Sequence, residues 1–137
     1  MSVEVVEHKN IRYAEIIWAS DVVKKTRFFS SVESPFQFGL LAHDAGYQEA
    51  PHFHQEIERT VKVLQQMFVV QRGVVGVQFF DDAGHMFKEI ILKAGDAISL
   101  IHGAHAIRVI EDMQCISVKQ GPFLGDALDK VLIEAKP

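Results

Sequence analysis

Three histidines have the residue type and placement to do chemistry together: His52, His54 and His105. His52 and His54 are separated by one residue, and residues i and i+2 of a β-strand project from the same side. Both imidazoles would then be directed at one point. His105 alternates with Ile107 and Val109 in a later segment, so it faces the core if those two residues do.

Converging imidazoles indicate a metal site. Imidazole is the commonest metal ligand of proteins near neutral pH, and a buried polar group without a partner costs about 1–3 kcal/mol. Three imidazoles in an apolar setting are therefore hard to keep without a metal. We expect one divalent transition-metal ion, and Fe, Zn, Ni or Mn would each suit such ligands. Of the other histidines, His8 and His85 are expected to be ordinary surface residues.

The composition excludes several function classes. The chain has 137 residues, 48% of them hydrophobic and 23% charged, with a net charge of −4. There is no basic patch to bind nucleic acid, and no apolar run long enough to cross a membrane. The single cysteine, Cys115, cannot form an intramolecular disulfide. The first residues do not resemble a secretory signal, so the expected location is the cytoplasm.

Short apolar segments with turns between them predict an all-β fold. Asp81–Gly84 combines aspartates with a glycine, which is typical of a hairpin turn, so Val74–Phe80 and Phe87–Leu92 should pair as antiparallel strands. Further strands are expected at 67–70, 97–101, 104–110 and 113–119. Residues 58–66 are ambiguous between helix and strand, and residues 128–133 predict a weak strand or a helical turn.

The chain shows no domain boundary. We expect a single domain with an N-terminal arm and strands at 1–35, a core at 36–121 and a tail at 122–137. The segment 11–29 contains several apolar residues that a mobile arm should not expose. It predicts a homodimer in which this segment packs across the partner's sheet, or else a segment that covers its own barrel.

Two longer patterns surround the histidines. The first is Gly46, five residues and then His52-Phe53-His54; the second contains Gly95-Asp96, Gly103 and His105. Together they resemble the two motifs of the cupin superfamily, over roughly residues 37–121. The resemblance is strongest to small single-domain cupin metalloproteins of unassigned function. It implies a double-stranded β-helix, a jelly-roll-like barrel, here with an N-terminal extension, a metal inside the barrel and frequent dimers.

The family pattern also has a glutamate seven positions before a glycine, and this sequence departs from it. Counting back from Gly73 gives Gln66, whereas Glu58 has the family's spacing after His54. We take Gln66 as the fourth ligand, with Glu58 as the alternative. The proline of the second motif is Ile101, and His105 comes one residue early.

The resemblance implies either a metal-dependent enzyme or a non-catalytic binder. As an enzyme, it would act on a small oxygen-bearing substrate, as a dioxygenase or as an isomerase or lyase of sugars or small acids. The alternative is a cupin that binds a small molecule or sugar without catalysis. Arg59 could bind an anionic group of the ligand, whereas Arg108 is expected to face away from His105 on a strand.

Overall fold

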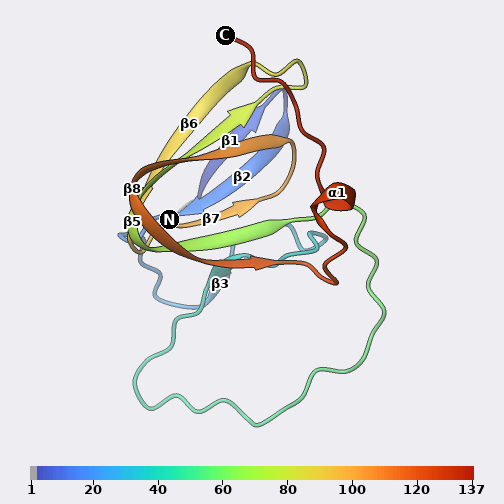
Figure 1. Ribbon diagram of the computed structural model, residues 1–137. Helices are drawn as coiled ribbons and strands as arrows, with labels where there is room; N and C mark the ends of the chain where they lie inside the picture. Colours follow the sequence, from blue (N-terminus) through green and yellow to red (C-terminus); the bar gives the residue numbers. More distant parts are fainter. Residues whose placement is uncertain (1–2) are drawn as a thin grey trace.

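The computed structural model describes residues 3–137, and antiparallel β-strands dominate this part of the chain (Figure 1). The elements are β1 (Glu4–His8), β2 (Ile11–Ile17), β3 (Arg27–Phe28), β4 (Gly39–Leu40), β5 (Gln66–Phe80), β6 (Met86–Lys93), β7 (Ala97–Leu100), β8 (Ala104–Lys119) and the single-turn helix α1 (Asp126–Asp129). The fold is all-β, as the sequence predicts.

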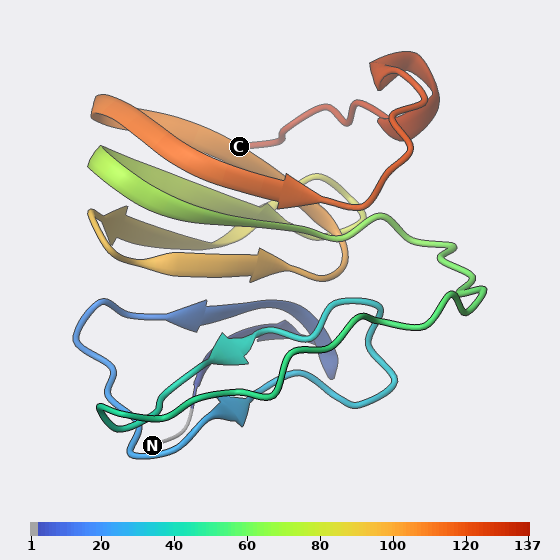
Figure 2. The ribbon, with the colours of Figure 1, turned by 90° about the horizontal axis from the view of Figure 1, so that it is seen from below.

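Six strands form one curled sheet, and β3 and β4 form a separate two-stranded ribbon. The order within the sheet is β1-β2-β7-β5-β6, and β8 pairs with β5. The first half of β5 lies between β7 and β8, and its second half lies between β6 and β8. The sheet is thus a half-barrel with β8 along one edge (Figure 2).

A bend in β5 and β8 turns this sheet into a half-barrel. The pairing of the two strands shifts register at Arg72 and Val74, on either side of Gly73. Gly73 has a φ of 86°, and a side chain there would collide with the backbone carbonyl of Asp112 on β8. Only glycine suits both the positive φ and the close approach of the two backbones. Beyond the bend, both strands curl back (Figure 1).

The hydrophobic core lies on the concave side of the sheet, which we call the inner face. Phe68 and Val70 project there before the bend, and Val75, Val77 and Phe79 project there after it, all nearly inaccessible to solvent. The opposite side is called the outer face. The residues that alternate with the inner-face residues along each strand project there, among them Met67, Val69, Ala97 and Ser99.

The predicted hairpin is confirmed, because β5 and β6 pair from Val74–Lys93 to Phe80–Met86 across the Asp81–Gly84 turn. Other boundaries differ from the prediction. The segments expected as pairs of strands are continuous through the bend in β5 and in β8. The ambiguous stretch is neither helix nor strand before β5 begins at Gln66. Near the C-terminus one helical turn forms, at 126–129, and no strand follows within 128–133.

The N-terminal apolar segment serves its own chain. β2 pairs with β1 on one side and β7 on the other, and both Ile16 and Ile17 are buried. These two side chains therefore pack within their own sheet, and the homodimer expected from the segment 11–29 stays a prediction. Phe28, in β3, remains half exposed.

Candidate functional site

His105 projects from the inner face of β8. It is the cross-strand partner of Phe79, and Ile107 and Val109 pair with Val77 and Val75 on the same face. The alternation of His105 with these two residues thus predicted its side correctly. Desolvation lowers the pKa of His105 and nearby Lys130 adds to the effect, while a backbone hydrogen bond at Gly103 opposes it. The lowered pKa favours the neutral imidazole, which is the form that can bind a metal ion, although His105 is still exposed to solvent on β8.

Gln66 lies on the inner face as well, because it alternates with Phe68 and Val70. Gln66 and Phe80 are equally far from Gly73 along the sequence, one before it and one after it. The bend at Gly73 turns the half of β5 that carries Gln66 back towards the half that pairs with His105 (Figure 1). The Gln66 amide Nε2 donates to the Ser117 hydroxyl over 2.9 Å. Its Oε1 atom accepts no bond among the described residues and remains available to a ligand.

His52 and His54 lie on the segment 41–65, which extends away from the sheet (Figure 1). Their ring centroids are 5.3 Å apart and the rings are perpendicular. Nδ1 of His52 is 2.9 Å from the Ala50 carbonyl oxygen and 3.7 Å from a Glu49 carboxylate oxygen. A protonated Nδ1 would donate to that carbonyl and leave Nε2 as the metal-binding nitrogen.

The two remaining candidates, Glu58 and Arg59, lie on the same exposed segment. Arg59 Nη1 donates to the Ile57 carbonyl over 3.3 Å, a local contact that leaves most of the guanidinium in solvent. Arg108 projects from the side of β8 opposite His105, where it forms a 2.7 Å ion pair with Glu89. This agrees with its expected orientation.

The structure therefore places the candidate ligands in two groups. Gln66 and His105 share the inner face, while His52, His54 and Glu58 lie on the extended segment. Within residues 3–137, no three His, Cys, Asp or Glu side chains are grouped as metal ligands.

One edge of β8 has no strand beside it in the described part of the chain (Figure 2). We call this the free edge. Inner-face side chains near it are only half covered, with Ile107 43% and Val109 53% exposed. The extended segment is also unusually apolar for an exposed stretch, and Phe53 is 88% exposed and Ile57 59%. Among residues 3–137, the free edge of β8 and the apolar segment that contains Phe53 and Ile57 therefore both lack a pairing strand.

His8 is less ordinary than the sequence indicated. Its ring stacks on Phe87 with the centroids 4.4 Å apart, and its Nε2 atom is buried without a hydrogen-bond partner among the described residues. The stack ties the end of β1 to β6 across the half-barrel. His85, in the hairpin turn, is exposed as expected.

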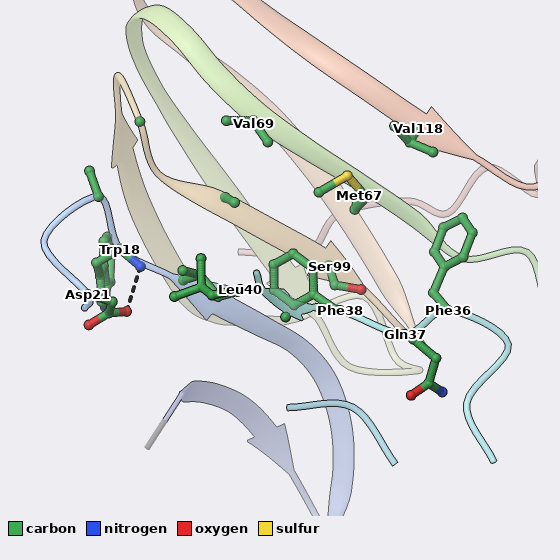
Figure 3. Close-up of a pocket in the computed structure, with 15 residues that line it drawn as sticks. Trp18, Asp21, Phe36, Gln37, Phe38, Leu40, Met67, Val69, Ser99 and Val118 are labelled. Carbon is green, nitrogen blue, oxygen red and sulfur yellow. Dashed lines mark hydrogen bonds between the residues drawn. The ribbon is translucent and has the colours of Figure 1, made fainter. Parts of the chain in front are cut away.

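A cavity that the sequence did not reveal lies on the outer face, under residues 36–40 (Figure 3). Its volume is about 520 Å³. The side chains around it are mainly apolar and include Ile17, Trp18, Phe36, Phe38, Leu40, Met67, Val69, Ala97, Ser99 and Val118. The only sequence signal was the density of aromatic residues before Leu40, and no pattern pairs them with a particular face of a sheet.

Comparisons with family models, with curated proteins and with solved structures found no match for this chain. No helix in residues 3–137 is long and apolar enough to cross a membrane.

Proposed function

We propose that this chain is a metal-binding cupin-like barrel in which residues 50–57 close the barrel against the free edge of β8. The observation that carries the proposal is the position of His105. It projects into the concave side of the sheet from a strand that, among residues 3–137, has no partner at its outer edge. An edge strand presents unpaired N–H and C=O groups that can pair with an added strand.

The closing segment is close enough to reach this edge. Residue 57 is nine positions before Gln66 at the start of β5, and nine residues span up to about 30 Å. The segment joins β5 at Gln66, which pairs with Lys119 at the end of β8, and the bend at Gly73 turns the start of β8, where Ala104 pairs with Phe80, back towards it (Figure 1). In an extended conformation His52, His54 and Glu58 share one side, so turning the histidines inwards turns Glu58 inwards too.

The proposed ligands are His52, His54 and His105, with Gln66 as the fourth and Glu58 as its alternative. A divalent metal bound there would supply Lewis acidity, which is strongest when the neutral Gln66 amide, rather than a carboxylate, completes the set. The residues of this chain would hold and orient a small oxygen-bearing molecule, and Arg59 would bind an anionic group on it. The reaction would be of the dioxygenase type or of the sugar or small-acid isomerase or lyase type. The second candidate is a non-catalytic small-molecule or sugar binder.

Elemental analysis of purified variants tests the metal site. Replacing His52, His54 or His105 with alanine should each reduce bound metal at least tenfold, because each removes one of few donors. His85→Ala, at an exposed turn position, is the matched control and should retain metal. Full metal retention by all three ligand variants would contradict the assignment.

A further inference from the structure

We infer that the outer-face cavity is a binding site for an uncharged, mostly apolar small molecule that carries one hydroxyl or carbonyl group. This site is on the opposite side of the sheet from Gln66 and His105 and does not depend on the proposed metal ligands. Its volume, about 520 Å³, lies within the range of about 300–1,000 Å³ usual for small-molecule sites.

The walls come from two layers. β7 and the first half of β5 supply the floor, and residues 36–40 form the cover, with Phe38 only 6% exposed (Figure 3). Trp18, at the end of β2, closes one side. Aromatic and branched side chains around a preformed space favour a planar or branched apolar ligand.

The polar recognition group is Ser99. It is 2% exposed, and its hydroxyl makes no hydrogen bond within residues 3–137. In Figure 3 its side chain extends from β7 towards Phe38 and the cavity. Ser99 lines the cavity, and its Oγ atom is not one of the fully buried side-chain atoms that lack a partner, so a ligand hydroxyl or carbonyl in the cavity would have access to it.

The charges at the cavity disfavour an anionic ligand. Among the described lining residues, none is Lys, Arg or His, and the one ionisable group is Asp21. Asp21 Oδ2 accepts the Trp18 backbone N–H over 2.8 Å, which fixes the carboxylate at the rim. An anionic ligand would be repelled by Asp21 and would find no cation to offset its charge.

The test uses the uncharged dye N-phenyl-1-naphthylamine with the full chain and a metal chelator, so that metal binding plays no part. Trp18 is the only tryptophan, so energy transfer from it to the dye reports binding beside it. We expect one saturable site. Ala97→Leu, which fills the cavity from its floor, should weaken dye binding at least tenfold, while Ala127→Leu in α1 should not change it.

Competition by naphthalene and 2-naphthol tests the role of Ser99. Ser99→Ala should weaken 2-naphthol about 3- to 10-fold, as expected for one lost hydrogen bond, and leave naphthalene unchanged. The competition experiment with Ser99→Ala tests the inference even if Ala97→Leu does not fold. Equal effects on both competitors, or unchanged dye binding to folded Ala97→Leu, would overturn the inference. It would also be overturned if the wild type bound no dye and light scattering showed a dimer that Ala97→Leu dissociates, because a second copy would then fill the cavity.

Discussion

Phe79 and His105 are direct cross-strand partners on the inner face, yet their surroundings differ sharply. Phe79 is 1% exposed and belongs to the core, whereas His105 lies one strand further out, on the edge strand. The covered interior thus ends between β5 and β8, and His105 is the polar residue at that boundary. A strand added beyond β8 would bring His105 inside the barrel.

The identity of the fourth ligand can be tested by exchanging its charge. Gln66→Glu should tighten divalent metal binding, because a carboxylate neutralises part of the charge of the ion and a neutral amide does not. Glu58→Gln should leave affinity nearly unchanged. Calorimetric titration of both variants with Zn²⁺ measures the effect. If Glu58→Gln abolished binding and Gln66→Glu had no effect, the extended segment would supply the fourth ligand.

The bend at Gly73 should be essential for stability. In Gly73→Ala the alanine must adopt a positive φ, which lowers the free energy of unfolding by about 1–2 kcal/mol. Its side chain must also displace the Asp112 backbone, which lowers it by about 1–3 kcal/mol more. Gly46→Ala is the matched control, because Gly46 has a φ of 92° but no atom within 4 Å of the added carbon. Denaturant unfolding should therefore show a clearly larger loss for Gly73→Ala. Equal losses would mean that the close approach of β5 and β8 contributes nothing.

Glu15 should make stability depend on pH. Its side chain is buried on β2, and desolvation raises its pKa above the ordinary 4.5 more than the nearby Arg12 lowers it. Because the pKa of Glu15 is raised in the folded state, its contribution to the free energy of unfolding is fully present below about pH 4.5. This contribution is lost as the pH rises through the folded-state pKa. Glu15→Gln should therefore be more stable than the wild type at pH 7.

The gain from Glu15→Gln should shrink as the pH falls towards 4, where the wild-type carboxyl is protonated. Thermal unfolding of both proteins across this range measures it. A variant that is less stable than the wild type at pH 7 would show that the 3.3 Å ion pair with Arg12 outweighs the cost of burial.

Local sequence patterns predicted the parts of the fold that depend on local chemistry. The Asp81–Gly84 turn determined the hairpin, and the alternation of His105 with Ile107 and Val109 determined the face of the histidine. The continuity of β5 through Gly73 was not predictable, because a glycine after an arginine is equally typical of a turn. The residues around Gly73 do not indicate that the backbone of Asp112 packs closely against this glycine.

The candidate site was predictable only in part for a related reason. Spacing shows that His52 and His54 can share a side, but the strand that a segment pairs with depends on distant residues. The cavity at Ser99 was missed because its two layers, residues 36–40 and β7, are about 60 positions apart in the sequence.

Residues 50–57 are proposed to pair with the free edge of β8 around a metal, and hydrogen exchange with and without Zn²⁺ tests this pairing most directly. Backbone amides that enter a strand pair become protected from exchange. Zn²⁺ should slow exchange at residues 50–57 and at 104–110 together, and His105→Ala should abolish the effect at both. Zn²⁺ binding that leaves exchange in these two segments unchanged would contradict the account.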